Sequence, residues 1–274
     1  MRWDLFKLAV SIVTYKHNVD EIVTVVNKLA DAVYNSENTC CQVNIVDNHG
    51  SFNGADFIKK VSHFDETIIS FDYIANPDNN GYGFGNNLAL EKSKESDYFL
   101  VLNPDAFLNV DALHKAISYM EANDECVLLA PKILSKIGVQ ESGVKEYPSI
   151  LVLLARLINL KPLNALCHKS LENYEARSVF RAVEPIDVNI ISGCFMLFKT
   201  TSLKCLGGFD TRFFMYFEDF DLSLRAQNIG RVIYHPDVII THLGGGAGRK
   251  GLNHVRFFIQ SMVKFFHKHG WKII

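Results

Sequence analysis

Three carboxylates lie within four positions of the sequence, in an aromatic setting. They are Glu218, Asp219 and Asp221, and four of the five residues before Glu218 are aromatic. Like charges at this spacing repel, and apolar surroundings make each charge costlier. A fold usually retains such a cluster where the charge has a task, such as proton transfer or metal binding. Acidic residues that stabilise a helix N-terminus are the other explanation, and the two explanations are compatible.

Polar residues also follow three apolar segments in the first half of the chain. Asp47, Asn76 and Asp105 each come at or just after the end of a short apolar run. Any one of them alone is an ordinary turn former. Three at successive strand ends predict a crevice for a ligand, because ligands bind beyond the carboxyl ends of parallel strands.

Strand and helix patterns alternate along the sequence with short connections. Strands are expected near residues 8–15, 43–47, 67–73, 98–102, 127–133 and 232–241, the last interrupted by Pro236, and regular structure is expected to resume at residues 187–198. Helices are expected near residues 18–34, 55–61, 86–94 and 111–122, after the acidic cluster to residue 228, and near 252–269. This pattern predicts an α/β fold, with a doubly wound, mostly parallel sheet flanked by helices and an amphipathic helix at the C-terminus.

The segment from residue 135 to residue 184 is less regular and contains the apolar run 149–160. This run is too short to span a bilayer. We expect a core helix or a flap over the crevice, with an interfacial helix as a third alternative. Asp4 and Lys7 interrupt the N-terminal apolar residues, so a signal peptide is not expected.

Composition limits the class of partner and the compartment. The 274 residues carry a formal net charge of -2, and no basic patch interleaves with the aromatic residues, so nucleic acid is not an expected partner. None of the six cysteines forms a Cys-x-x-Cys pair. We therefore expect a reducing, cytoplasmic location without disulfides.

Taken in order and spacing, these segments resemble the inverting, GT-A-fold glycosyltransferases of family 2. Within that family the chain is similar to the bacterial rhamnosyltransferase-type group that builds surface polysaccharide such as O-antigen. The segments that carry the resemblance are residues 10–15, 46–48, 76–87, 102–105 and 193–225, and His242 with the glycine-rich loop after it. The resemblance implies one domain over residues 1–274. Its parts would be a nucleotide-sugar-binding half (1–133), an acceptor and catalytic half (134–250) and a C-terminal helix (251–274).

A nucleotide-sugar donor site follows from the resemblance. Asp47 would accept the N3–H of uracil or thymine, which favours a UDP- or dTDP-linked sugar. The glycines after the third strand would let the backbone approach the nucleotide closely. The expected donor-binding residues are Thr14, Tyr15, Asp47, Asn76, Gly81, Gly85, Asn86, Asn103, Asp105 and Arg249. Arg249 follows a glycine-rich loop and would hold phosphates, although a solvated basic turn explains it equally well.

The resemblance also implies a divalent cation, Mg²⁺ or Mn²⁺. The triplet Asn103-Pro104-Asp105 stands where many family members have Asp-x-Asp. Asp105 keeps a carboxylate, whereas Asn103 supplies no charge. His242 would be the second protein ligand. Without the resemblance, the simpler interpretation of His242 is a residue that caps a strand end.

The acidic cluster then acquires distinct roles. Asp219 matches the catalytic base of the family, which takes the proton of the acceptor hydroxyl. Glu218 and Asp221 would raise the proton affinity of Asp219 or hold acceptor hydroxyls. Arg225 lies one helical turn after Asp221 and is expected to pair with it. Gly193 and Cys194 would lie on the acceptor side.

The expected reaction is inverting, metal-assisted transfer of a hexose to a saccharide acceptor. L-rhamnose from dTDP-rhamnose is preferred as the donor, with UDP-galactose, UDP-glucose and UDP-N-acetylglucosamine as alternatives. The acceptor is expected to be linked to polyprenyl diphosphate. The basic and aromatic C-terminal helix fits peripheral contact with the cytoplasmic face of the inner membrane, but packing on the domain or a homodimer partner fits equally.

Two other functions are compatible with the same α/β pattern. Nucleotidyltransferases favour a glycine-rich basic loop after the first strand, and Thr14-Tyr15-Lys16-His17-Asn18 lacks one. A non-catalytic nucleotide- or sugar-binding module would not need Asp219. The substitution Asp219→Asn therefore separates an enzyme from such a module.

Overall fold

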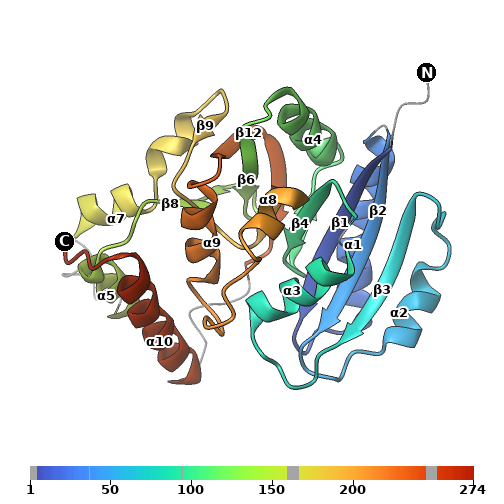
Figure 1. The fold of residues 1–274 in the computed structure, drawn as a ribbon, viewed down its shortest axis with the longest axis horizontal. Coiled ribbons are helices and arrows are strands. Elements are labelled where there is room, and N and C mark those ends of the chain that lie inside the picture. Colours follow the sequence, from blue (N-terminus) through green and yellow to red (C-terminus); the bar gives the residue numbers. More distant parts are fainter. Residues whose placement is uncertain (1–4, 37, 94, 159–166, 245–251) are drawn as a thin grey trace.

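The computed structural model describes residues 5–36, 38–93, 95–158, 167–244 and 252–274 (Figure 1). The strands are β1 (Phe6–Thr14), β2 (Thr39–Asp47), β3 (Ile69–Ala75), β4 (Tyr98–Leu102), β5 (Ala106–Leu108), β6 (Cys126–Leu134), β7 (Gln140–Glu141), β8 (Val144–Lys145), β9 (Ile186–Asp187), β10 (Ile190–Ile191), β11 (Phe195–Lys199) and β12 (Arg231–His242). The helices are α1 (Val19–Asn35), α2 (Gly54–Val61), α3 (Tyr82–Lys92), α4 (Ala112–Ala122), α5 (Ile150–Ile158), α7 (His168–Tyr174), α8 (Thr200–Cys205), α9 (Glu218–Ala226) and α10 (Leu252–His269), with a 3₁₀ turn at Arg177–Arg181.

One large sheet forms the centre of the molecule. Its strand order is β3-β2-β1-β4-β11-β6-β12-β5, with β7 beside β6 and β9 beside β12. Strands β3, β2, β1 and β4 run parallel, as do β6 and β12, whereas β11 is antiparallel to both β4 and β6. The prediction of a mostly parallel sheet flanked by helices is confirmed, and β11 is the strand that joins its two parallel parts.

Each face of the sheet is covered by its own helices. Alternate residues of β1 show the division, since Val10 and Ile12 pack with α1, α2 and α4, whereas Ala9 and Val13 pack with α3, α8 and α9. Figure 1 shows α3, α8 and α9 on the near face. This alternation is the two-residue period of a strand buried on both faces.

A third apolar cluster lies away from the sheet and joins α5, α7 and α10 to the segment before α9. Phe213 and Phe217 meet Phe265 and Phe266 there, together with Leu153 of α5. The apolar run 149–160 thus forms a core helix over its described part, because one side of α5 is buried in this cluster. The last helix has the predicted bounds, 252–269.

Several elements differ from the sequence prediction. Residues 187–198 contribute to three short strands, β9, β10 and β11, and helix α8 was not predicted. Helix α3 begins at Tyr82, four residues earlier than predicted, so Gly83 and Gly85 belong to its first turn and not to a loop. Both glycines face tight contacts, since a Cβ at Gly83 would lie 2.8 Å from the Phe209 side chain.

Strand β12 continues past Pro236, because a register shift between His235 and Ile239 accommodates the missing N–H of the proline.

Gly81 caps α3 at a point where only glycine fits. Its φ is +102°, and a Cβ there would lie 2.3 Å from the carbonyl oxygen of Phe214, which also accepts a hydrogen bond from the Tyr82 N–H at 3.0 Å. Gly138 has a similar φ of +77°, but no atom lies within 4 Å of its missing Cβ.

We expect Gly81→Ala to destabilise the fold more than Gly138→Ala. Both substitutions strain a left-handed backbone, but only Gly81→Ala also collides with a backbone carbonyl. The additional loss should be roughly 1–3 kcal/mol in the free energy of unfolding. Urea denaturation of both variants measures it, and equal losses would show that the Phe214 contact is unimportant.

Candidate active site

Helix α9 begins with the acidic cluster, directly after a strained segment of backbone. Tyr216 and Phe217 have φ values of 69° and 65°, in the left-handed region that non-glycine residues rarely adopt. Phe217 is held there by packing, since its ring lies 5.2–5.3 Å from those of Phe258 and Phe265. Such strain is retained where the surrounding structure fixes it, and it often marks a functional site.

Asp219 is held by two backbone N–H groups. Its Oδ2 accepts a hydrogen bond from Gly193 at 2.9 Å, and its Oδ1 accepts one from Phe220 at 3.0 Å. Burial raises the pKa of the Asp219 carboxyl above its usual value, and these backbone donors offset part of the rise. The result is a fixed carboxylate with a higher proton affinity than an exposed aspartate.

Glu218 lies beside Asp219 and is itself buried. Its Oε2 has no hydrogen-bond partner within the described residues. Burial, followed by the charge of Asp219, raises the pKa of Glu218 well above its usual value. These surroundings favour the protonated acid at Glu218, so the pair carries less than two full charges.

Both carboxyl groups line a cavity of about 390 Å³. Its other lining residues are Tyr82, Asn103, Tyr174, Ser192, Gly193, Cys194, Met215, Tyr216, Phe217, Phe220 and Phe258. Gly193 and Cys194 are therefore brought together with Asp219, as the sequence predicted.

Burial raises the pKa of the Cys194 thiol to about 12, so the thiol stays protonated at neutral pH. Asn103 also belongs to this cavity, whereas Asp221 does not line it.

Tyr82 connects the two parts of the site. Its hydroxyl oxygen lies 2.9 Å from both Asn103 Oδ1 and the Gly193 carbonyl oxygen. The backbone N–H of Asn103 in turn donates to the carbonyl of Cys194 at 2.9 Å. The first residue of α3, the Asn103-Pro104-Asp105 triplet and the loop that holds Asp219 thus form one hydrogen-bonded unit.

Asp221 points away from the cavity, toward the C-terminal helix. It is fully buried, and its Oδ2 lies 2.8 Å from Arg225 Nε, which confirms the predicted pair. Its Oδ1 lies 2.5 Å from Lys268 Nζ and 2.7 Å from His269 Nε2, both at the end of α10. Burial alone would raise the pKa of Asp221, but these hydrogen bonds and the charge of Arg225 hold it below its usual value.

We expect Asp221→Asn to loosen α9 from α10. Asparagine removes the buried anion that Arg225, Lys268 and His269 share. Among the described residues, only Lys268 of these three keeps another carboxylate partner, Asp210. The loss of these charged hydrogen bonds should cost roughly 1.5–3 kcal/mol in the free energy of unfolding near neutral pH. Since the pKa of Asp221 is lowered by folding, the loss should shrink as the pH falls below the unfolded-state pKa of about 3.9.

Urea denaturation at several pH values measures this difference. Asp124→Asn is the matched control, because Asp124 is fully exposed and lies 3.4 Å from Lys199. Equal stability of both variants at neutral pH would contradict the anchoring role of Asp221.

The two donor-site residues at the ends of β2 and β3 are buried and adjacent. The Asp47 carboxylate accepts hydrogen bonds from the N–H groups of His49 and Phe52, at 2.9 and 3.0 Å. The Asn76 N–H donates to the Asp47 carbonyl, and its side chain donates to Asn48 Oδ1 at 2.7 Å. Asp47 thereby shapes the loop after β2. Its Oδ2 also accepts a hydrogen bond from the Tyr73 hydroxyl at 3.3 Å, so Oδ1 is the oxygen that can still accept a further bond.

The remaining donor-site residues surround the carboxyl ends of β1 and β2. Thr14 is buried, and its hydroxyl donates to the Val46 carbonyl. Tyr15 is half exposed, with its ring 5.1 Å from that of His49. Asn86 is buried, and its Oδ1 has no hydrogen-bond partner among the residues described. A Cβ at Gly85 would press on Val13 and Asn48 at 3.1–3.2 Å. Arg249 lies outside the described residues.

Asp105 and His242 meet at the end of β12. Asp105 Oδ1 lies 3.1 Å from His242 Nε2, and Glu141 Oε2 lies 4.0 Å from His242 Nδ1. Burial lowers the pKa of His242, but the hydrogen bond and charge of Asp105 and the charge of Glu141 raise it more, so the net shift is upward. Two ligand atoms 3.1 Å apart fit neighbouring positions around a small divalent cation with metal–ligand distances of about 2.1 Å.

Few possible metal ligands surround Asp105 and His242 in the described part of the chain. No group of three or more His, Cys, Asp and Glu side chains is arranged there as a metal centre. Asp105 and His242 would therefore hold a cation as a pair. Water and phosphate oxygens would complete its coordination, as is usual for Mg²⁺ at phosphate sites.

Three further residues beside the cavity were missed by the sequence analysis. Tyr174 and Phe258 line the cavity from α7 and α10. Lys145 lies behind Tyr174, with its Nζ 5.6 Å from the ring centre and 2.8 Å from Ser142 Oγ. Burial, and then the charge of Arg156, lowers the pKa of Lys145 to about 8. Lys145 and Tyr174 belong to the irregular 135–184 segment, where no motif marked them.

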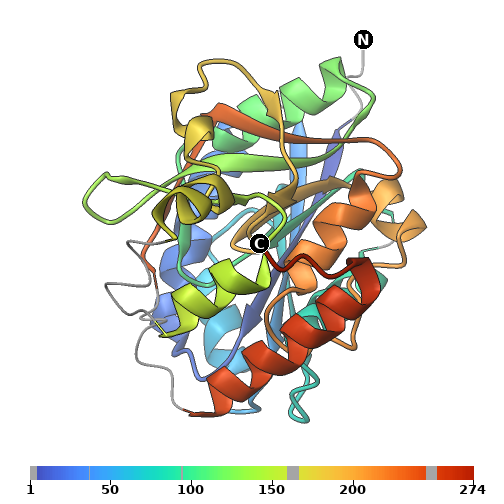
Figure 2. The same ribbon diagram turned by 90° about the vertical axis from the view of Figure 1, so that its left-hand side faces the viewer.

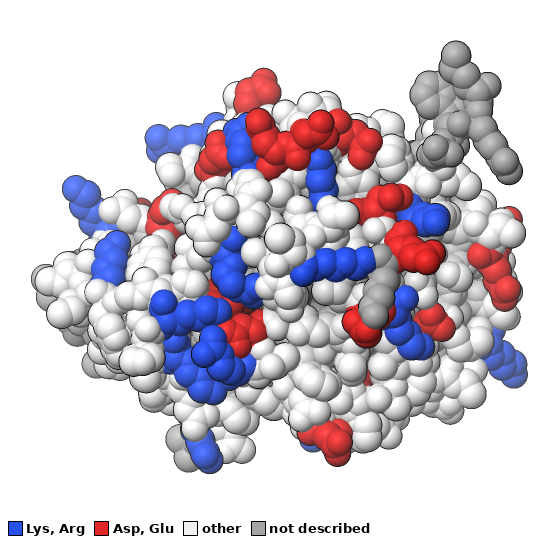
Figure 3. Space-filling model, in the orientation of Figure 1, with Lys and Arg blue, Asp and Glu red and all other residues white. Residues whose placement is uncertain are grey.

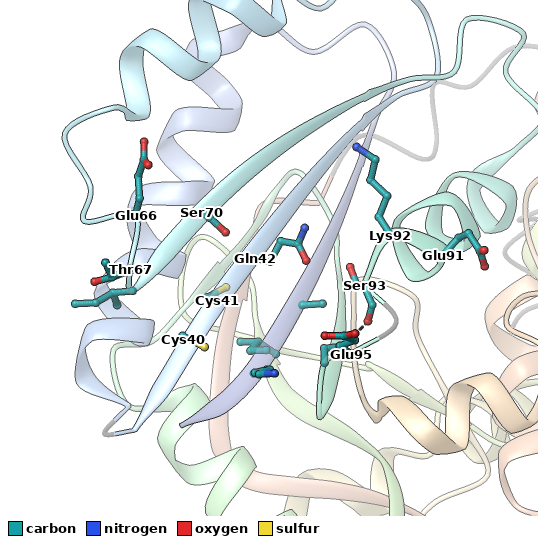
Figure 4. Close-up of a pocket in the computed structure, with 15 residues that line it drawn as sticks. Cys40, Cys41, Gln42, Glu66, Thr67, Ser70, Glu91, Lys92, Ser93 and Glu95 are labelled. Atoms are coloured by element: carbon teal, nitrogen blue, oxygen red, sulfur yellow. Dashed lines mark hydrogen bonds between the residues drawn. The ribbon is translucent and has the colours of Figure 1, made fainter. Parts of the chain in front are cut away.

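A second cavity, of about 550 Å³, lies at the opposite edge of the sheet (Figure 4). It is bordered by the amino ends of β1, β2 and β3 and by the end of α3, with Gln42, Ser70 and Lys92 among its lining. It shares no lining residue with the Asp219 cavity. Because parallel sheets bind their ligands at the carboxyl ends of strands, this cavity is not part of the candidate active site.

Comparison with known families now decides the assignment. The family described as "Glycosyl transferase family 2" matches residues 10–207, well over half of the chain. The chain belongs to glycosyl transferase family 2. The matched residues run from β1 to α8, so α9 and Asp219 lie just beyond them.

Individual relatives of this family 2 chain are distant. Rhamnosyltransferase WbbL of Escherichia coli K12 is 28% identical over 164 residues, 57% of this chain and 58% of that protein. The low-salt glycan biosynthesis hexosyltransferase Agl10 of Haloferax volcanii is 28% identical over 166 residues, 58% of this chain and 48% of that protein. The chain thus matches about half the length of these curated relatives.

The fold is shared with solved glycosyltransferases. The mannosyltransferase PcManGT from Pyrobaculum calidifontis, solved with GDP-Man and Mn²⁺, superimposes with a TM-score of 0.60 at 15% identity. The match covers 95% of this chain and 63% of that one. The expected GT-A fold is thereby confirmed. In the described ranges, no helix is both long enough and apolar enough to cross a membrane.

Proposed function

We propose that this family 2 chain transfers a hexose from a nucleoside-diphosphate sugar to a saccharide hydroxyl, with inversion at the anomeric carbon. One observation carries the proposal. Asp219 lines a cavity large enough for a sugar and is fixed there by the N–H groups of Gly193 and Phe220. Each carboxylate oxygen accepts one of these bonds and retains a lone pair that can take a proton.

The proposed step is a single displacement. The acceptor oxygen forms a bond to the anomeric carbon while its proton passes to Asp219. The bond from that carbon to the diphosphate oxygen breaks, and its electron pair leaves with the nucleoside diphosphate. The raised pKa of Asp219 suits this role, because a base with higher proton affinity takes the proton more readily.

Asp105 and His242 are the residues proposed to hold a divalent cation. Such a cation supplies charge neutralisation for the departing diphosphate. The 3.1 Å separation of their ligand atoms supports the assignment, as does the Mn²⁺ in the mannosyltransferase of the same fold. Tyr82 and Asn103 would orient the donor between these residues and Asp219.

L-rhamnose from dTDP-rhamnose is the donor we propose, with UDP-linked galactose, glucose or N-acetylglucosamine as alternatives. The relative WbbL is named a rhamnosyltransferase, which supports rhamnose. The resemblance to the family would have the Asp47 carboxylate accept a pyrimidine N3–H, which supports a thymidine or uridine donor. The fold itself does not select the base, since PcManGT holds GDP-Man.

The acceptor is proposed to be a saccharide linked to polyprenyl diphosphate. Tyr174, Tyr216, Phe217, Phe220 and Phe258 surround the cavity, and aromatic rings of this kind pack against the apolar faces of sugars. Glu218, with its unpartnered Oε2, would bind a further acceptor hydroxyl. The free cysteines agree with a reducing compartment, so we place the reaction at the cytoplasmic face of a membrane.

The substitution Asp219→Asn tests the assignment of the base. Asparagine keeps the shape of the side chain but cannot take the proton. We expect transfer to fall by about 10²–10⁴-fold, the usual contribution of a general base. Binding of dTDP-rhamnose with Mn²⁺, measured by calorimetry, should be retained.

Asp237→Asn is the control, since Asp237 is an exposed carboxylate on β12. Unchanged transfer by Asp219→Asn would exclude Asp219 as the base. No binding of any dTDP- or UDP-sugar by the wild-type protein would reject the proposed donor class.

A further inference from the structure

Helices α5 and α10 and the C-terminal residues lie side by side on one face of the molecule, as Figure 2 shows. Backbone hydrogen bonds tie the end of the chain to the start of α5. The N–H of Ile150 donates to Lys272 O at 2.9 Å, and that of Leu151 donates to Ile273 O at 3.2 Å. We refer to the exposed side of residues 150–158, 256–267 and 270–274 as the α5–α10 face.

Large apolar side chains are unusually exposed on this face. Trp271, Ile273 and Ile274 have 56%, 70% and 80% of their surface accessible. Leu154 and Ile158 are also exposed and lie four residues apart, hence on one side of α5. A folded chain rarely leaves such a group of apolar residues uncovered without a binding role.

Helix α10 contributes a matching stripe. Ile259 and Val263 are exposed and lie one turn apart. Successive residues of a helix are 100° apart around its axis, so Ile259 and Val263 lie next to Met262 and Phe266 on the helix surface. Met262 and Phe266 pack in the apolar cluster that includes α5. Lys264 and Lys268 project from the other flank, toward Arg212 O and Asp210. The exposed apolar residues of α10 therefore lie on the side of the helix that faces α5.

The charges on this face are of one sign. Residues 150–158 and 252–274 contain no Asp or Glu but include Arg156, Arg256 and Lys272. The acidic groups at its border are Glu172 and Glu175 near α7, and Glu175 is paired with Arg156 at 2.8 Å. The Lys and Arg side chains that gather at the lower left of Figure 3 are seen from the front of α10, the flank on which Lys268 pairs with Asp210, so they are not counted as part of the α5–α10 face.

We propose that the α5–α10 face docks on an anionic lipid bilayer and lies in its interfacial layer. Exposed isoleucine, leucine and tryptophan beside cations, without acidic residues, are the composition of interfacial membrane-binding surfaces. Phe258 of α10 lines the Asp219 cavity, so the docked face lies next to the acceptor site. This inference rests on the proposed function in one respect only, because the purpose of docking would be access to a lipid-linked acceptor.

Vesicle co-sedimentation of the full chain tests the proposal without any transfer reaction. We expect binding to vesicles of phosphatidylcholine mixed with phosphatidylglycerol, and much weaker binding to phosphatidylcholine alone. Raising the salt concentration should weaken binding to the anionic vesicles, because salt screens the cations. Failure of this experiment would leave the assignment of Asp219 untouched.

Two sets of substitutions locate the surface. The double variant Ile273→Ser and Ile274→Ser should reduce partitioning by about tenfold or more, since it removes apolar side chains from the contact. Arg256→Glu with Lys272→Glu should remove the preference for anionic vesicles. Ile137→Ser is the matched control, because Ile137 is 84% exposed and lies between β6 and β7, outside this face.

Three results would overturn the proposal. The first is no binding of the wild-type chain to anionic vesicles. The second is equal loss of binding in the Ile137→Ser control and the Ile273→Ser/Ile274→Ser variant. The third is a dimer in light scattering that the double variant dissociates, together with no vesicle binding, which would assign the face to a second copy of the chain.

Discussion

The hydrogen bond from the Gly193 backbone N–H to the Asp219 carboxylate is the contact on which the site depends. It joins the loop before β11, which inserts antiparallel into the sheet, to the start of α9. Tyr82 extends the connection from Gly193 to Asn103. The proposed base Asp219, the triplet Asn103-Pro104-Asp105 and the first turn of α3 are thus positioned through one small loop. A displacement of that loop would move all three together.

Holding a buried carboxylate at the start of a strained helix requires anchors elsewhere. Two left-handed residues precede α9, and burial raises the pKa of both Glu218 and Asp219. Asp221, one turn into the same helix, has the opposite environment, with cations from α9 and α10 around it. Of the three neighbouring carboxyl groups, Glu218 and Asp219 thus line the cavity where the chemistry is proposed, and Asp221 anchors α9 to α10. The C-terminal helix contributes to the site through this contact and through Phe258.

The sequence was sufficient where the information is local. The alternation of strands and helices, the bounds of α10 and the pair Asp221–Arg225 follow from periodicity and spacing. Contacts between distant segments could not be predicted in this way. His269 reaches Asp221 across 48 positions, and Lys145 lies behind Tyr174 in a segment without a motif. Asp105 was expected in the crevice from its position after a strand, but its pairing with His242 came from the resemblance alone. The glycine-rich start of α3 looked like a loop because glycine is a poor helix former.

The central claim is that one base acts in one displacement at the anomeric carbon. The anomeric configuration of the product tests this most directly, because a single displacement inverts that centre. NMR of the glycoside formed from a donor of known anomeric configuration gives the outcome from the one-bond C1–H1 coupling, because the H1–H2 coupling of rhamnose is small in both anomers. We expect a product of the opposite configuration to the donor. A product of retained configuration would contradict it.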